Sequence, residues 1–397
     1  MARIKVFTNH YYPENFRINE LVEGMTDDDV DVICQIPNYP KGQFFDGYSL
    51  TKRRKDKVGH ANVKRLAVIP RGNNSIMLIL NYLSYIVSSF FYGVFTKDKA
   101  DYVLVYITSP IFVAWSGLRF AERNKARSTL YLLDLWPDSL ETMLGIKNQF
   151  IIKRLEAMCL RIYDRFDTIA VSSMGFIKAL EDYGVDSNKI VYLPQHADKN
   201  DEKLRFDFKS EVLKIVFTGN IGEAQGLDVL VDAASALSKQ NNESVLFEIV
   251  GDGRYRKTLE QKISDQGLSH YFKFKGQVDK KEIPSILSNN HFGFVSLADE
   301  EIFSKTLPAK VQSYMTYGIP ILASANGEIP YILDKAKCGF ASPAQDGLAL
   351  ANLITELQGL SVEKLEELSQ NGYNYSVEHF NQDKLTKQLL QIMKEGK

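Results

Sequence analysis

Apolar residues recur along this chain in short runs that alternate with amphipathic stretches. In the first half, the runs typical of β-strands are Ile4–Thr8, Val30–Ile36, Val63–Leu66, Tyr102–Ile107, Thr129–Asp134 and Thr168–Ser172. Stretches with helical spacing lie between them, for example Phe112–Asn124 and Phe150–Tyr163. Strands that alternate with helices predict a parallel sheet with helices on both faces.

A second series of the same kind follows a charged break at Ala197–Glu211. Its strand-like runs are Leu213–Thr218, Leu246–Val250, Phe272–Lys275, Phe292–Val295 and Pro320–Ala323. Its helical stretches are Leu227–Lys239, Arg254–Gln266 and Pro308–Tyr317, and Gln382–Met393 is a last amphipathic helix. The fold class is therefore α/β, with two doubly wound domains over 1–198 and 211–375 joined by a charged linker.

One stretch, 75–95, carries no charge at all. Its apolar residues recur at helical spacing at Ile79, Leu83, Ile86, Phe90 and Val94. The segment 52–71 before it holds eight Lys and Arg and one Asp, and such a cluster beside an apolar face is attracted to anionic lipid. We expect a helix lying in a membrane interface. An ordinary core helix and a true span remain alternatives for it, as does a solvated loop for the basic run.

Composition excludes several classes of protein. Hydrophobic residues make up 45% and charged residues 24%, as in globular proteins, and the formal charge of −1 leaves no basic excess for nucleic acid. The three cysteines, Cys34, Cys159 and Cys338, form no metal or disulfide pattern and are typical of a cytoplasmic protein. The first residues are too polar for a signal peptide and are typical of a first strand.

Glycine-rich turns in the second half are the first candidates for chemistry. FTGNIGEAQG at 217–226 joins a strand to a helix, and Gly219, Gly222 and Gly226 would let backbone approach a phosphate. VGDG at 250–253 ends the next strand. Each could instead be a tight turn without a ligand, since neither a dinucleotide fingerprint nor a Walker loop is complete.

The segment 300–320 adds a helix N-terminus with two lysines. Pro308 opens the helix, and Lys305 and Lys310 beside this end would suit a diphosphate. In the first half, HYYPENFR at 10–17 and DLWPDS at 134–139 follow strands directly. Open α/β sheets bind ligands at such carboxyl ends. A structural histidine, a turn aspartate and a solvated loop are the alternatives for these segments.

These motifs, together with IPNYPKG at 36–42, FKGQV at 274–278 and LPAKVQSYMTYGIPIL at 307–322, resemble a known family. The chain is similar to glycosyltransferases of family 4 with the GT-B fold. More closely, it resembles the bacterial branch that includes the WbuB-like N-acetyl-L-fucosamine transferases and the colanic-acid glycosyltransferases. The resemblance implies two Rossmann-like domains facing a cleft. The C-terminal domain would bind a UDP-sugar, the N-terminal domain a polyprenyl-diphosphate-linked sugar, and a helix in 376–397 would pack back on the first domain.

The motifs and the resemblance together give the expected site. The catalytic candidates are His10, Asp134, Asp138 and Lys305. The donor-binding candidates are Gly219, Asn220, Gly222, Gln225, Gly251, Val278, Glu301, Thr306, Lys310, Gln312 and Ser313. The acceptor-binding candidates are Glu14, Arg17 and Trp136.

This sequence departs from the family pattern at four donor positions. Asn220 and Gln225 stand where most members carry Arg and Lys, and Lys305 and Ser313 stand where most carry two glutamates. Phosphate neutralisation would then move to Lys305 and Lys310. The carboxylate contact with the ribose would be replaced by Ser313, by Gln312 or by Glu301.

The resemblance implies a retaining transferase for an N-acetylated hexosamine in capsule, O-antigen or exopolysaccharide synthesis, with 6-deoxy sugars such as N-acetyl-L-fucosamine among the candidates. We expect no cofactor and no metal, because cations and amides can neutralise the diphosphate. The expected location is the cytoplasm, peripherally on the inner face of the cell membrane. A UDP-sugar 2-epimerase and a non-catalytic scaffold of the same fold are the rival hypotheses.

Overall fold

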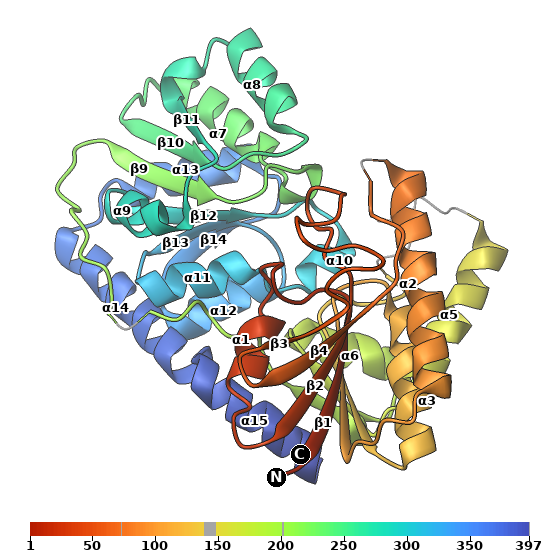
Figure 1. Cartoon of the computed structure of the whole chain (residues 1–397). Coiled ribbons are helices and arrows are strands. Elements are labelled where there is room, and N and C mark those ends of the chain that lie inside the picture. The colour runs from red at the N-terminus through yellow and green to blue at the C-terminus, as the bar shows by residue number, and fades with distance from the viewer. Residues whose placement is uncertain (73, 139–147, 201, 397) are drawn as a thin grey trace. The chain divides into compact units, whose positions relative to one another are not determined.

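The computed structural model describes residues 1–72, 74–138, 148–200 and 202–396, and it divides into two compact units (Figure 1). Unit 1 comprises Met1–Gln195 and Gln382–Lys397, and unit 2 comprises His196–Asn381. The charged break expected to be a linker therefore falls within unit 2. Phe206 and Phe208 explain this difference, because both pack against the core of that unit in spite of the charges around them.

The strands of unit 1 form one sheet. They are β1 (Arg3–Thr8), β2 (Asp29–Gln35), β3 (Lys55–Val58), β4 (Ala61–Leu66), β5 (Tyr102–Ile107), β6 (Arg127–Leu132), β7 (Thr168–Val171) and β8 (Ile190–Tyr192). Among the described residues their order is β3-β4-β2-β1-β5-β6-β7-β8, and all neighbours are parallel except β3 with β4. Part of the basic run is thus an antiparallel hairpin rather than a loop.

Helices cover both faces of this sheet. They are α1 (Ile18–Glu23), α2 (Ser75–Phe95), α3 (Ala114–Asn124), α5 (Gln149–Tyr163), α6 (Met174–Asp182) and α15 (Gln382–Glu395), with the short turns η1 (Ile111–Val113) and η2 (Ser187–Lys189). Alternation along β1 assigns the faces. Ile4 and Val6 share a core with α1 and α15, whereas Phe7 packs on Tyr92 of α2 and Phe120 of α3.

The last two helices belong to different units. α14 (Val362–His379) contacts α11 and α12 of unit 2, whereas Leu385, Leu389 and Met393 of α15 complete the core of unit 1. The helix that packs back on the first domain therefore begins at residue 382 and not at 376.

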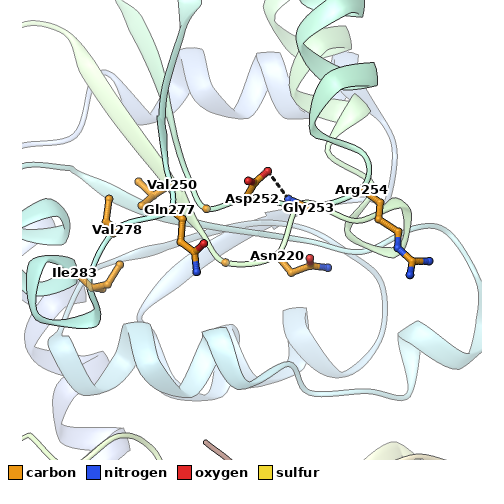
Figure 2. Close-up of a pocket in the computed structure, with 10 residues that line it drawn as sticks. Asn220, Val250, Asp252, Gly253, Arg254, Gln277, Val278 and Ile283 are labelled. Carbon is orange, nitrogen blue, oxygen red and sulfur yellow. Dashed lines mark hydrogen bonds between the residues drawn. The ribbon is translucent and has the colours of Figure 1, made fainter. Parts of the chain in front are cut away.

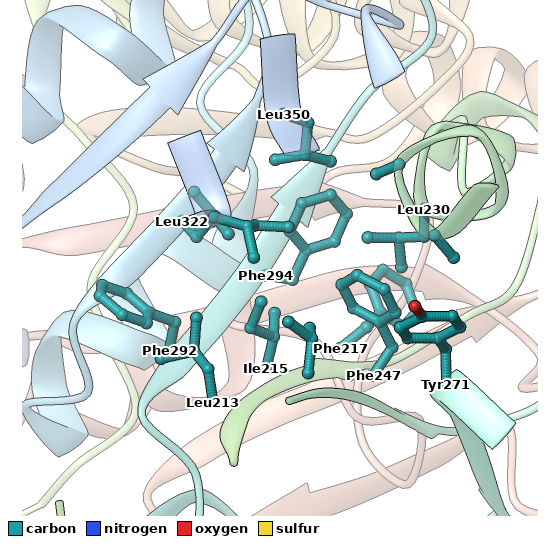
Figure 3. Close-up of a cluster of buried hydrophobic side chains, with 14 of the residues drawn as sticks. Leu213, Ile215, Phe217, Leu230, Phe247, Tyr271, Phe292, Phe294, Leu322 and Leu350 are labelled. Carbon is teal, nitrogen blue, oxygen red and sulfur yellow. The ribbon is translucent and has the colours of Figure 1, made fainter. Parts of the chain in front are cut away.

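Unit 2 contains a second parallel sheet. Its strands are β9 (Leu213–Thr218), β10 (Val245–Val250), β11 (Phe272–Gly276), β12 (Phe292–Ser296), β13 (Ile321–Ser324) and β14 (Gly339–Ser342), in the order β11-β10-β9-β12-β13-β14 among the described residues. Its helices are α7 (Asp228–Lys239), α8 (Arg256–Asp265), α9 (Ile283–Ser288), α10 (Glu301–Ser304), α11 (Ala309–Tyr317), α12 (Glu328–Ala336), α13 (Gly347–Leu357) and α14, with η3 (Glu223–Gln225), η4 (Ser269–Tyr271) and η5 (Lys280–Glu282). Aromatic and aliphatic side chains such as Phe217, Phe247 and Phe294 fill one face of the sheet (Figure 3).

The helix α2 is amphipathic, but its polar face points into unit 1 and its apolar face points outward. Its inward face carries polar groups: Tyr85 is 1% exposed and its hydroxyl donates to the carbonyl of Thr8 at 2.5 Å. Its apolar side chains point outward, and Leu83 and Phe95 are 53% and 71% exposed. A core helix would have the opposite arrangement. Among the described residues, Ile76–Phe95 is the segment long and apolar enough to cross a membrane.

Candidate functional site

In unit 2, the backbones that leave the neighbouring strands β9 and β10 approach each other closely at Gly219 and Gly251. We call this close approach the glycine crossing. Gly219 and Gly251 have φ angles of +129° and +135°. A Cβ on Gly251 would lie 1.9 Å from the carbonyl oxygen of Gly219, so a side chain is sterically impossible there. Because these glycines carry no side chain, they leave room for a ligand against the backbone at the strand ends.

A cavity of about 710 Å³ opens at this crossing (Figure 2). It is lined by Gly219, Asn220, Val250, Gly251, Asp252, Gly253, Arg254, Gln277, Val278 and Ile283. Val278 and Ile283 make one end of it apolar, whereas Arg254 extends at the other end. Four predicted donor residues, Gly219, Asn220, Gly251 and Val278, thus lie together. Arg254 and Gln277 were not predicted, although Arg254 directly follows VGDG and Gln277 lies within FKGQV.

Lys310 supplies a cation beside the glycine crossing. It is the second residue of α11, its Nζ donates to Oε1 of Gln225, and the ammonium lies 3.7 Å from the centre of the Phe217 ring. A Cβ on Gly219 would meet Lys310 Cε at 3.0 Å, so the lysine lies directly against the loop. Burial lowers the pKa of Lys310 to about 7. No carboxylate forms a salt bridge with it among the described residues, and an anionic ligand would restore its charge.

A carboxylate from the start of unit 2 reaches Ser313. The Ser313 hydroxyl donates to Oδ2 of Asp198 at 3.2 Å, and Lys280, two residues after Val278, donates to Oδ1 at 3.0 Å. Sequence analysis missed Asp198, because 115 residues separate it from Ser313 and no motif joins them.

The remaining donor candidates and the catalytic candidate Lys305 are engaged locally or buried. Lys305 forms an ion pair with Glu301 at 2.8 Å, four residues apart. The Thr306 hydroxyl donates to the carbonyl of Ile302, and Gln312 is 1% exposed inside unit 2. Gly222 precedes η3 as its N-cap. The structure does not bring these side chains into the cavity wall.

In unit 1, Glu14 holds His10 in place. Nδ1 of His10 lies 2.6 Å from Oε2 of Glu14, and Oε1 accepts from the backbone N–H groups of Asn38 and Tyr39 at 2.6 and 2.7 Å. The imidazole also stacks on Phe16 at 4.3 Å. Both carboxylate oxygens are therefore used inside the fold, and the ring is oriented with Nε2 away from its carboxylate partner.

Asp134 lies just beyond the end of β6 with an unusual charge state. Burial raises the pKa of its carboxyl to about 7, and no hydrogen bond to it is found among the described residues. A half-buried carboxyl whose pKa is raised towards neutrality at a strand end is a typical functional group. Its charge also raises the pKa of Tyr82 on α2, a smaller effect than burial of that tyrosine, so the two side chains are neighbours.

Arg71 and Tyr39 complete this edge of unit 1. The Arg71 guanidinium lies 5.2 Å from the centre of the Tyr39 ring, which contacts His10 edge-on at 5.4 Å. The backbone N–H of Arg71 donates to Oδ1 of Asn38. Sequence analysis counted Arg71 only as part of the basic run. Its place against Tyr39, which in turn contacts His10, could be found only from the fold.

The other candidates of unit 1 differ in exposure. Trp136 is 2% exposed and packs edge-on against Phe112, so the ring is a core group, although its indole N–H has no acceptor among the described residues. Asp138 is half-buried. Arg17 occupies the N-cap position of α1, where its side chain makes no capping hydrogen bond.

Metal ligands do not cluster in the part of the chain that the structure describes. No group of three or more His, Cys, Asp or Glu side chains there could hold a metal ion. Cys34, Cys159 and Cys338 are buried free thiols.

The chain is similar in sequence to several known proteins. Residues 198–375 match the family described as Glycosyl transferases group 1. The chain is 28% identical over 293 residues to WcaI of Escherichia coli K12, named as a colanic acid biosynthesis glycosyl transferase, covering 67% of this chain and 70% of that protein. It is 25% identical over 336 residues to the glycosyltransferase WbjE of Pseudomonas aeruginosa, with 78% and 81% covered.

Two solved structures share the fold over nearly the whole chain. Anabaena HepE, in complex with UDP and glucose, superposes with a TM-score of 0.67 at 15% identity and covers 100% of both chains. Sucrose-phosphate synthase of Thermosynechococcus elongatus gives a TM-score of 0.72 at 15% identity, with 99% and 98% covered. The fold class is confirmed: two α/β units, each built on a mainly parallel sheet, of the GT-B type. The protein is a glycosyltransferase, and its unit 2 carries the glycosyl transferases group 1 domain.

Proposed function

We propose that the protein transfers an N-acetylated hexosamine, with a 6-deoxy sugar such as N-acetyl-L-fucosamine as the first candidate, from a UDP-sugar to a polyprenyl-diphosphate-linked sugar. The cavity at the Gly219–Gly251 crossing, with Lys310 against it, carries the proposal. HepE, which shares the fold, binds UDP, and WcaI is named for colanic acid biosynthesis. We therefore place the reaction in bacterial capsule, O-antigen or exopolysaccharide synthesis.

The donor would lie along the cavity with its diphosphate at Gly219. Lys310 and the first N–H groups of α11 would neutralise the diphosphate, and the apolar end at Val278 would take the uracil. Asp198, held by Ser313, would accept hydrogen bonds from the ribose hydroxyls. In this account the charge that a metal could supply comes from Lys310, so we propose that no metal or cofactor takes part.

The acceptor would bind at the carboxyl edge of unit 1. His10 and Asp134 would orient the attacking hydroxyl, and Arg71 would pair with the acceptor diphosphate. In a retaining transfer the new bond forms between this hydroxyl oxygen and the anomeric carbon. The bond to the donor diphosphate breaks on the same face, and the leaving diphosphate takes the hydroxyl proton.

The exposed apolar face of α2 would bring unit 1 to the lipid. Leu83, Val87 and Phe91 are each more than half exposed, and polar groups cover the inward face instead. Lysines and arginines of 52–71 complement an anionic membrane surface. We propose that the protein works in the cytoplasm, peripherally on the inner face of the cell membrane.

A donor panel tests this function. UDP release from several UDP-N-acetylhexosamines would be measured with and without a short polyprenyl-diphosphate-GlcNAc in detergent. Release that needs both substrates supports the proposal, and the panel identifies the sugar. Isomerised UDP-sugar formed without an acceptor would favour the epimerase. No turnover and no UDP binding by calorimetry would favour the scaffold.

A further inference from the structure

A second cavity lies in unit 1, at the amino end of the sheet. Its volume is about 460 Å³, and it is lined by residues of the β3–β4 hairpin, of β1 and β2, and of the last turn of α2. Its wall is formed by Lys5, Asp31, Ile33, Lys55, Asp56, Lys57, Asn62, Val63, Lys64, Tyr92 and Asp98.

The acids of this wall are already neutralised by the fold. Lys5, which is 1% exposed, donates to Asp31 at 2.7 Å and to Asp98 at 3.1 Å. The carboxylate of Asp56 is bound by Arg65, whose side chain is fully buried, and by Arg53. All three acids are thus paired within the fold, although the charge of Asp98 also acts on Lys64, where it opposes the larger lowering of the pKa by burial.

Those lysines form no ion pair within the part of the chain that the structure describes. Lys55 and Lys57 project from the edge strand β3. Lys64 lies half-buried with Nζ 4.4 Å from the centre of the Tyr92 ring, and burial lowers its pKa. Three cations around one cavity repel each other, and a bound anion would relieve that cost.

The direction of α2 places this cavity relative to the candidate acceptor site. Tyr85 of α2 donates a hydrogen bond to the carbonyl of Thr8, the last residue of β1. Tyr92, further along α2, contacts Lys5, which lies near the start of β1. The helix therefore runs from the carboxyl edge of the sheet to its amino edge. Phe91 and Phe95, exposed on the outer face, stand next to Tyr92 at the cavity end.

We propose that this cavity binds a phosphate group, and that its source is the headgroup of an anionic phospholipid. An apolar helix face that ends at a lysine-lined cavity matches the two parts of such a lipid, acyl chain and phosphate. The inference goes beyond the transfer reaction and rests on the membrane contact proposed for α2. Held at this end, α2 would lie along the surface with the acceptor edge of unit 1 also at the lipid.

Vesicle binding by the full chain tests this site. Vesicles of phosphatidylcholine with and without phosphatidylglycerol would be titrated with wild type, with Lys55→Gln/Lys64→Gln, and with Lys41→Gln/Lys52→Gln. The last pair removes the same charge from exposed lysines of the same unit outside the cavity. We expect the cavity pair to lose at least tenfold more affinity for phosphatidylglycerol vesicles than the control pair. Binding to neutral vesicles should be unchanged.

A variant that leaves the net charge unchanged distinguishes binding in the cavity from attraction to a diffuse basic patch. Asn62→Trp places a ring in the cavity mouth, and circular dichroism would verify that it folds. It should weaken binding to the anionic vesicles as the lysine pair does. Equal losses for both lysine pairs, or normal binding by Asn62→Trp, would overturn the headgroup site while leaving the α2 contact intact. If wild type binds no vesicle, the membrane part of the proposed function fails as well.

Soluble glycerol 3-phosphate distinguishes the two sources of phosphate. Competition at millimolar concentration, lost in Lys55→Gln/Lys64→Gln, would show that the cavity takes the phosphate itself and that free phosphates also fit. Absence of competition, with the vesicle difference intact, would assign the cavity to the lipid.

Discussion

Two side chains carry charges that burial opposes, one in each unit. Asp134 at the end of β6 and Lys310 at the start of α11 both have a pKa shifted to about 7. Neither forms a salt bridge among the described residues. Groups of this kind cost stability in the free protein and gain it when a ligand supplies what burial removed.

The Asp134 carboxylate should therefore lower the stability of the folded protein while it supports the transfer reaction. Because its pKa is raised above that of the unfolded chain, its ionisation destabilises the fold as pH rises from about 4 through about 7, by as much as about 4 kcal/mol at pH 8. We expect Asp134→Asn to unfold at a higher temperature than wild type at pH 8, with the difference shrinking towards pH 4. Scanning calorimetry measures this.

The same variant should lower the rate of transfer by about 10²–10⁴-fold, as for a lost acid–base or orienting group. A variant with normal kcat would remove Asp134 from the mechanism. A variant less stable at pH 8 than at pH 4, relative to wild type, would contradict the raised pKa.

Lys310 should take up a proton when UDP binds. At pH 8 most of the free lysine is neutral, since its pKa is about 7, and a diphosphate alongside would raise that pKa again. Calorimetry in buffers of different ionisation enthalpy should show uptake of close to one proton. Lys310→Met should abolish the uptake and lower UDP affinity by about 10- to 100-fold, the loss of one charge-assisted contact.

Lys305 provides the comparison. It is paired with Glu301 by an exposed contact, so Lys305→Ala should change UDP affinity less than Lys310→Met. The reverse order would move the phosphate site to α10.

Asp198 should make binding of UDP depend on the 2′-hydroxyl of the ribose. We expect wild type to bind UDP about tenfold more tightly than 2′-deoxy-UDP, and Asp198→Asn to lose most of that difference. Glu202→Gln, a change of the same kind at an exposed carboxylate four residues further along the chain, should keep it. Equal discrimination by wild type and Asp198→Asn would place the ribose elsewhere.

At the scale of elements, α2 is the feature with the clearest test. Leu83→Ser and Val87→Ser change exposed side chains, so they should leave the melting temperature nearly unchanged while weakening vesicle binding. Tyr85→Phe removes a buried hydrogen bond and should cost about 1–2 kcal/mol of stability with vesicle binding intact. The opposite pattern would make α2 an ordinary core helix.

The bounds of α2 could be predicted from the sequence, but its burial could not be predicted in full. Charge-free composition marks 75–95, and helical spacing gives the apolar stripe. The polar contacts of the inner face depend on strand ends distant in sequence. The edge strand β3, KDKV, was missed because its exposed charges carry no alternating apolar signal.

At the scale of the whole molecule, local patterns predicted more than distant contacts did. Most of the strands, the glycines at the ends of β9 and β10 and the lysine of α11 follow from segments that can be recognised alone, whereas β3, β8 and β14 were not predicted. Asp198 beside Ser313, and Glu14 turned inward onto His10, Asn38 and Tyr39, required the fold. Glu14 has a residue type that suits a sugar ligand, yet both its oxygens are used by the protein.

The most direct test of the account is the lipid product itself. Purified protein would be incubated with the donor that the panel selects and with polyprenyl-diphosphate-GlcNAc, and the lipid would be analysed by mass spectrometry. The account predicts a lipid that carries one added N-acetylated hexosamine, formed by wild type and nearly absent with Asp134→Asn. Sugar released to water with the lipid unchanged, or equal product from Asp134→Asn, would contradict it.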